Sequence, residues 1–171
     1  DNLPDGPSVI VANHASYVDG LLLKAFLPPR FSFVIKGEMR RYPLVHFVLR
    51  RAGARFVERY GMDGDFWVRN PREQNNAVAA HLKANLTDLA QYYHAEAQQD
   101  GEKSDYQQAA NWYRKYLAYF PGEPDTANTN FLLAEILFES EDFGLATAEY
   151  ERTAYGYPFH DKSAEAGYAA I

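Results

Sequence analysis

A repeat with a period of 37 residues lies in the second half of the chain and limits the folds open to it. The repeated positions, each followed by its equivalent, are Asp105 and Asp142, Tyr106 and Phe143, Ala109 and Ala146, Tyr113 and Tyr150, Pro121 and Pro158, Ala127 and Ala164, and Phe131 and Tyr168. A small residue with an aromatic residue four positions later allows two helices to approach closely, and a later proline stops the helix. The pattern predicts helices over about residues 76–99, 105–119, 125–140, 143–156 and 161–171, stacked as αα-hairpins.

This pattern resembles the tetratricopeptide repeat of bacterial proteins, whose usual period is 34 residues. The resemblance implies an all-α helical array over residues 76–171 that binds a protein or peptide ligand on the face formed by the first helix of each pair. The candidate partner-binding residues on that face are Asn85, Asp88, Tyr92, Asn128 and Glu135. Two plainer interpretations stay open, namely a generic pair of helical hairpins and an ordinary solvated helix face for each polar residue.

The start of the chain carries a different kind of signal. An apolar run over residues 8–12 is typical of a short buried strand, and it places His14 at the strand's end and Asp19 five residues later. A histidine and a carboxylate at such a corner can form a general base with the group that orients it. The alternative is an ordinary histidine at a strand end and an aspartate that caps a helix.

The residues around this pair resemble the glycerolipid O-acyltransferases, which acylate glycerol-3-phosphate or 1-acylglycerol-3-phosphate. The family's first motif, N-H-x-S-x-x-D, is matched by Asn13, His14, Ser16 and Asp19. Its second block is matched, in order, by Lys36, Glu38, Pro43, Gly53, Phe56, Val57 and Arg59. The resemblance covers residues 8–59 and implies a small α/β fragment over residues 1–59.

The same resemblance implies a mechanism without a cofactor. His14 would take the proton from the acceptor hydroxyl, Asp19 would orient the imidazole, and Arg59 would bind the acceptor's phosphate. The further residues assigned to substrate binding are Asn13, Ser16, Lys36 and Glu38. The acyl donor would be acyl-CoA or acyl-carrier protein and the acceptor a lysophospholipid, at the cytoplasmic side of a membrane; the repeat part would also suit the cell envelope.

One expected motif is missing. The family's third motif resembles Glu-Gly-Thr-Arg, and the chain contains no Glu-Gly dipeptide. We therefore expect a binding or scaffold module of tetratricopeptide type that carries an incomplete acyltransferase fragment. The alternative is a working phospholipid-biosynthetic acyltransferase with His14 as its general base.

The balance of charged residues changes at about residue 59, where the first of these two resemblances ends. Residues 1–59 hold nine Lys and Arg against five Asp and Glu, whereas residues 60–171 hold eight against eighteen. We expect an α+β chain overall, with an α/β part over residues 1–59, a linker over 60–75 and helical repeats over 76–171. The acidic second part argues against nucleic acid as a partner.

Three further expectations concern partners. Residues 39–51 place an apolar segment between arginine pairs, which favours either peripheral contact with an anionic membrane or a helix that covers one face of a small sheet. The end of the array at Ile171 interrupts a helix pair, so we expect self-association or packing against the first 59 residues. The chain has no cysteine, its histidines lack ligand spacing, and no uncharged run is long enough to span a bilayer, so neither a metal site nor a transmembrane segment is expected.

Overall fold

The computed structural model describes residues 43–171, with side chains from Arg50 onward, and this part of the chain is helical, without strands. Its helices belong to one compact unit, Arg41–Ile171. They are α2 (Pro43–Tyr60), α3 (Asp65–Arg69), the 3-10 helix η2 (Arg72–Gln74), α4 (Asn76–Asp100), α5 (Lys103–Tyr119), α6 (Thr126–Glu139), α7 (Phe143–Tyr155) and α8 (Ser163–Ala169). The α/β part predicted for residues 1–59 lies outside the described residues, except for residues 43–59, which are helical.

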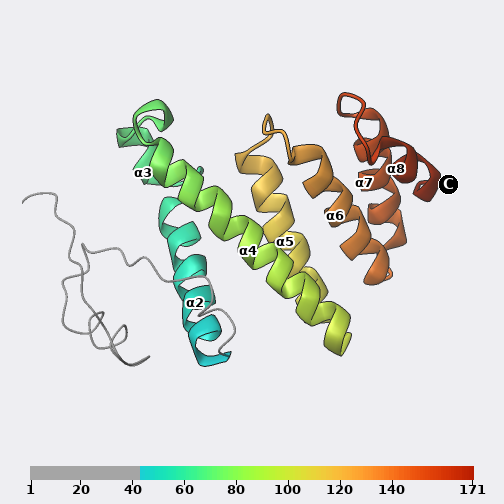
Figure 1. The fold of residues 1–171 in the computed structure, drawn as a ribbon, viewed down its shortest axis with the longest axis horizontal. Coiled ribbons are helices and arrows are strands. Elements are labelled where there is room, and N and C mark those ends of the chain that lie inside the picture. Colours follow the sequence, from blue (N-terminus) through green and yellow to red (C-terminus); the bar gives the residue numbers. More distant parts are fainter. Residues whose placement is uncertain (1–42) are drawn as a thin grey trace, which may run out of the picture. The chain divides into compact units, whose positions relative to one another are not determined.

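From α4 onward, helices that are neighbours along the chain are also neighbours in space (Figure 1). The loops between them are short, so each helix runs back along the one before it and α4 with α5 and α6 with α7 form helical hairpins. The five helices predicted between residues 76 and 171 are all present, and their ends agree with the prediction to within two residues.

Glycine and proline set the helix ends in the expected way. Gly101 follows α4 with a left-handed φ of 72°, and its backbone N–H donates to the Ala97 carbonyl at 2.8 Å, which closes the last turn. Helix α5 ends at Tyr119, before Pro121, and α7 ends at Tyr155, before Pro158. Since proline has no backbone N–H to donate, neither helix continues past it.

Equivalent residues of α5 and α7 occupy equivalent environments. Ala109 and Ala146 are 0% and 1% exposed, and Tyr113 and Tyr150 are each 3% exposed. The preceding helices agree less well, because Phe131 in α6 is buried while its equivalent in α8, Tyr168, is 84% exposed. Phe131 packs against the Tyr150 ring of α7 at 5.8 Å between centroids, and no described helix follows α8 to cover Tyr168 in the same way. Residues related by the 37-residue period are therefore more alike in burial between α5 and α7 than between α6 and α8.

The core is continuous across the hairpins. Leu82 and Leu86 of α4, Tyr116 of α5 and Leu133 and Ile136 of α6 are at most 1% exposed and belong to one apolar cluster. Val57 of α2 belongs to the same cluster, since α2 packs along α4. Helix α2 also runs unbroken through residue 59, where the sequence predicts the end of the α/β part, as far as Tyr60.

Candidate functional site

The residues of the first acyltransferase motif lie outside the described part of the chain. The same holds for the two charged residues that open the second block. The residues concerned are Asn13, His14, Ser16, Asp19, Lys36 and Glu38. Their roles stay predictions from the sequence.

Arg59 is the predicted phosphate ligand whose position is described. It lies in the last turn of α2, is exposed, and has its guanidinium carbon 5.7 Å from the centroid of the Tyr60 ring. Among the described residues, no carboxylate forms an ion pair with it. Its planar set of N–H donors therefore faces solvent, as recognition of a phosphate requires.

Three of the predicted partner-binding residues come from α4. The Asn85 side chain donates to the His81 carbonyl at 2.7 Å, and its Oδ1 lies so close to Gly53 of α2 that a Cβ there would be 2.8 Å away. Asp88, one turn further along α4, is exposed. Asn85 is therefore a contact residue between two helices of the chain itself.

Tyr92 also contacts α2. The guanidinium carbon of Arg50 lies 3.7 Å from the centroid of the Tyr92 ring, close enough for a cation–π interaction. Burial raises the pKa of the Tyr92 hydroxyl to about 12, and a hydrogen bond with Glu96 adds to the effect. The Tyr92 ring is therefore half-buried and contacts α2 of the chain itself.

The other two partner-binding candidates lie apart from these. Asn128 of α6 is exposed at the edge of a hollow of about 90 Å³, which is also lined by Thr87 and Gln91 of α4 and Tyr116 of α5. Glu135 of α6 accepts a hydrogen bond from the Tyr150 hydroxyl of α7. The five candidates therefore fall in three places: the α2–α4 contact, the hollow, and the α6–α7 contact.

A buried histidine, which the sequence reasoning missed, connects three helices. His94 of α4 is 9% exposed; its Nδ1 lies 3.0 Å from the Tyr113 hydroxyl of α5, and its Nε2 lies 3.4 Å from a Glu139 carboxylate oxygen of α6. Gln98 donates to the other Glu139 oxygen at 2.8 Å. Burial lowers the pKa of His94, although the Glu139 and Glu135 charges oppose this shift. The repeat position of Tyr113 was the available signal, because a tyrosine buried at a helix contact needs a partner for its hydroxyl.

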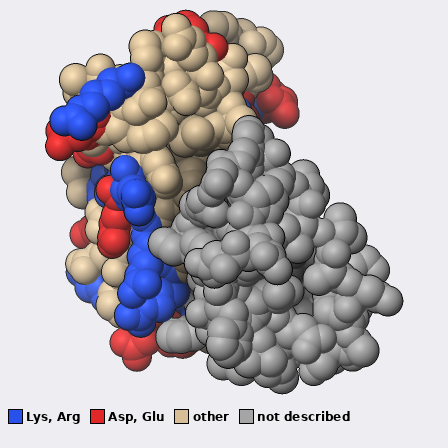
Figure 2. All heavy atoms as spheres, turned by 90° about the vertical axis from the view of Figure 1, so that its left-hand side faces the viewer, with Lys and Arg blue, Asp and Glu red and all other residues tan. Residues whose placement is uncertain are grey.

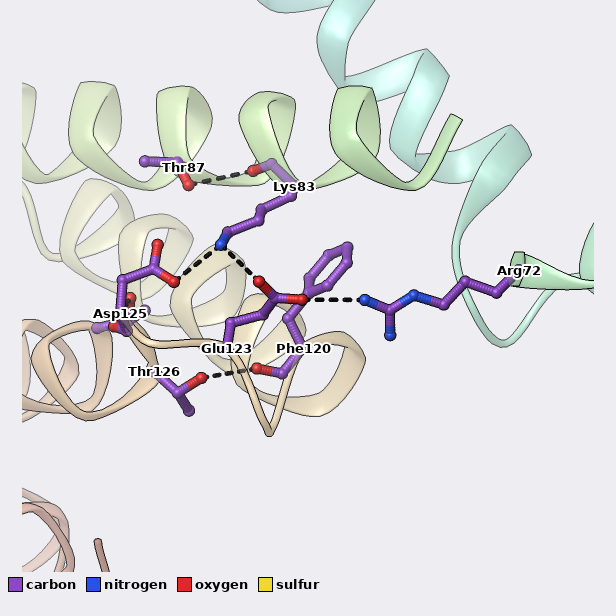
Figure 3. Close-up of polar contacts among 8 residues, drawn as sticks. Arg72, Lys83, Thr87, Phe120, Glu123, Asp125 and Thr126 are labelled. Carbon is purple, nitrogen blue, oxygen red and sulfur yellow. Dashed lines mark hydrogen bonds and ion pairs between the residues drawn. The ribbon is translucent and has the colours of Figure 1, made fainter. Parts of the chain in front are cut away.

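A second polar cluster links the start of α4 to the loop between α5 and α6 (Figure 3). The Lys83 ammonium lies 3.0 Å from Glu123 and 2.9 Å from Asp125, and the Arg72 guanidinium lies 3.0 Å from the other Glu123 oxygen. Burial alone would lower the pKa of Lys83, but its hydrogen bonds to Asp125 and Glu123 outweigh burial and raise it. The Thr126 hydroxyl donates to the Phe120 carbonyl at 2.8 Å and holds the same loop. Since both cations are paired, this cluster joins helices and has little free charge for a ligand.

Comparison with known proteins identifies the family. A family model described as Acyltransferase matches residues 1–122, which is more than half of the chain and includes α2 through α5. The chain therefore belongs to the acyltransferase family. Neither a curated protein nor a solved structure matches it.

Within residues 43–171, none of the helices combines the length and the apolar character needed to cross a bilayer. In that same part of the chain, no group of His, Asp or Glu side chains is placed to hold a metal ion.

Proposed function

We propose that this protein transfers an acyl chain from a thioester, acyl-CoA or acyl-carrier protein, to a hydroxyl of a glycerol-phosphate acceptor. The observation that carries this proposal is the family match over residues 1–122, because that range contains both blocks that resemble the glycerolipid enzymes. The acyltransferase interpretation thus takes precedence over the scaffold interpretation that the missing third motif favoured. Phospholipid biosynthesis is the process that this substrate class would serve.

In the proposed reaction, His14 accepts the proton from the acceptor hydroxyl as its oxygen attacks the thioester carbonyl. An ester bond forms, the carbon–sulfur bond breaks, and the proton passes from the imidazolium to the departing thiolate. Asp19 keeps the imidazole in the tautomer that can accept the proton. Arg59 binds the acceptor's phosphate, a role supported by its exposure and by the absence of a carboxylate partner among the described residues.

The experiment is a thioester-consumption assay with long-chain acyl-CoA and lysophosphatidate. The unmodified chain is compared with His14→Ala and with His81→Ala, in which a solvent-exposed histidine of α4 is removed instead. General-base catalysis contributes about 10²–10⁴-fold to a rate. We expect His14→Ala to lose activity by a factor in this range and His81→Ala to keep it. Equal loss in both variants, with unchanged helical circular dichroism, would contradict the role of His14.

The binding of a protein or peptide ligand by the helical part stays a second proposal, which rests on the stacking of the helices. The matched burial of Ala109 with Ala146 and of Tyr113 with Tyr150 is what a stacked array of helix pairs requires. Asn128, which the sequence predicts as a partner-binding residue, is exposed on α6 and is the position we propose to test for such a ligand. The test is Asn128→Arg, which should abolish binding of a ligand recovered with the intact chain. Arg114→Glu, at an exposed position of α5, should leave that binding unchanged.

A further inference from the structure

The exposed side of α2 carries a row of arginines. Arg51, Arg55 and Arg59 are spaced four residues apart, so they lie on one side of the helix over about 12 Å of its length. All three are exposed, and in the described part of the chain no carboxylate forms an ion pair with any of them. Figure 2 shows Lys and Arg side chains gathered in a band on the face of the molecule that carries α2. We call these three residues the arginine row.

The rest of α2 explains why the row faces outward. Gly53 and Val57 are buried against α4, so that side of the helix is fixed by packing. At 100° per residue, positions 51, 55 and 59 lie on a different side from 53 and 57. Glu58 is the one exposed acid of α2 in the described range, and at 100° per residue it lies beside the row, about 20° from the direction of Arg51.

An aromatic cluster adjoins the row at the C-terminal end of α2. Phe56 and Tyr60 each follow an arginine of the row by one residue, and their rings lie 4.6 Å apart between centroids. Tyr60 continues the cluster to Phe66 of α3 at 4.9 Å, and the Trp67 indole donates to the Tyr60 carbonyl at 2.7 Å. The cluster is half-buried, whereas Val68 beside it is 83% exposed.

We propose that Arg51 and Arg55 of the arginine row, together with the aromatic cluster, bind the surface of an anionic phospholipid bilayer, while Arg59 at the end of the row keeps its role toward the acceptor's phosphate. Arginines attract the phosphates of such a surface, and half-buried aromatic residues with an exposed aliphatic residue suit the boundary between headgroups and acyl chains. The whole chain carries a net charge of −6, so attraction to an anionic surface has to come from the local positive charge of the row. The preference for lipid over nucleic acid rests on the aromatic cluster with Val68 and on the lipid substrate of the proposed function.

The test is co-sedimentation of the 171-residue chain with vesicles of phosphatidylcholine, with and without phosphatidylglycerol. The double variant Arg51→Gln, Arg55→Gln removes two charges from the row. The control variant Lys103→Gln, Arg114→Gln removes two exposed charges from α5. One basic residue near an anionic surface contributes about 5-fold to binding, so the row variant should bind about 30-fold more weakly and the control should bind as the unmodified chain does. Val68→Ser should also weaken vesicle binding, and added salt should weaken binding of the unmodified chain.

Several results would overturn the proposal. These are equal binding to vesicles with and without phosphatidylglycerol, equal loss in the row and control variants, or binding to a short DNA duplex as tight as to the anionic vesicles. Circular dichroism identifies any variant that has failed to fold. His14→Ala separates the two proposals, because it should abolish thioester consumption and leave vesicle binding unchanged. Vesicle binding without turnover would count against the proposed function alone, and turnover without vesicle binding against the lipid surface alone.

Discussion

Asn130 should be one of the most sensitive polar positions in the helical array. It is fully buried in α6, and its amide donates to the Glu149 carbonyl and to the Thr153 hydroxyl of α7, each at 2.9 Å. Its Oδ1 accepts a hydrogen bond from the Tyr157 hydroxyl at 3.1 Å. One side chain therefore ties α6 to α7 and to the segment that follows α7.

The magnitude follows from these contacts. A hydrogen bond contributes about 0.5–1.5 kcal/mol net, so Asn130→Ala removes about 2–4 kcal/mol from the free energy of unfolding. Asn128→Ala is the matched control, because Asn128 is exposed two residues earlier in the same helix. Both variants gain about 0.5 kcal/mol of helix propensity, so the difference between them reports the buried hydrogen bonds.

The assay is urea unfolding followed by helical circular dichroism. Asn130→Ala should lower the midpoint without changing the slope, while Asn128→Ala should leave the midpoint unchanged or raise it slightly. Tyr157→Phe, which removes one of the three hydrogen bonds, should cost about 1 kcal/mol. Free energies for Asn130→Ala and Asn128→Ala that agree within about 0.5 kcal/mol would refute the reasoning, since surface substitutions vary by that amount.

Two further predictions concern charge. Burial lowers the pKa of His94 below its ordinary value of 6.5, so near that pH the unfolded chain binds more protons than the folded one. The contribution of neutral His94 to the free energy of unfolding is therefore complete above pH 6.5 and is lost as the pH falls through the pKa of His94 in the folded chain. His94→Gln should therefore flatten the decline of the urea midpoint on acidification, and an unchanged decline would contradict this. Lys83→Met breaks the ion pairs with Glu123 and Asp125 and should cost about 1 kcal/mol at low salt and less at high salt. Lys83 lowers the pKa of Glu123; at Asp125 burial alone would raise the pKa, but the hydrogen bonds with Lys83 and Tyr116 outweigh it. The cost of Lys83→Met should therefore fade as pH falls below about 4, and a cost independent of salt and pH would contradict this prediction.

The helices of the second part could be predicted closely because their signals are local. Pro121 and Pro158 mark helix ends, and the spacing of alanine and tyrosine marks the buried side of α5 and α7. Each of these features depends on residues within a few turns of one another. The tetratricopeptide assignment remains a prediction that rests on this period.

The candidate binding face was harder to predict for a physical reason. Helical spacing shows that Asn85 and Tyr92 share a side of α4, but it does not show which helix packs on that side. Helix α2 packs there, with Gly53 against Asn85 and Arg50 against Tyr92. Tyr116 of α5, which also lines the hollow beside Asn128, is 1% exposed and belongs to the core.

The His94 network depends on long-range pairing. Its partners Tyr113 and Glu139 come from two other helices, and no short motif connects the three residues. The sequence alone therefore does not indicate that His94 contacts Tyr113 and Glu139. The motif N-H-x-S-x-x-D is local instead, and it lies within residues 1–122, which the family model matches; the roles of its residues stay predictions.

The most direct test of the central claim is to measure the acylated product. The intact chain is incubated with long-chain acyl-CoA and lysophosphatidate, and phosphatidate is quantified by mass spectrometry, which separates acyl transfer from hydrolysis of the thioester. We predict phosphatidate formation that depends on His14 and continues in His81→Ala. Absence of phosphatidate from a protein that circular dichroism shows to be folded, or equal amounts from the His14→Ala variant, would contradict the account.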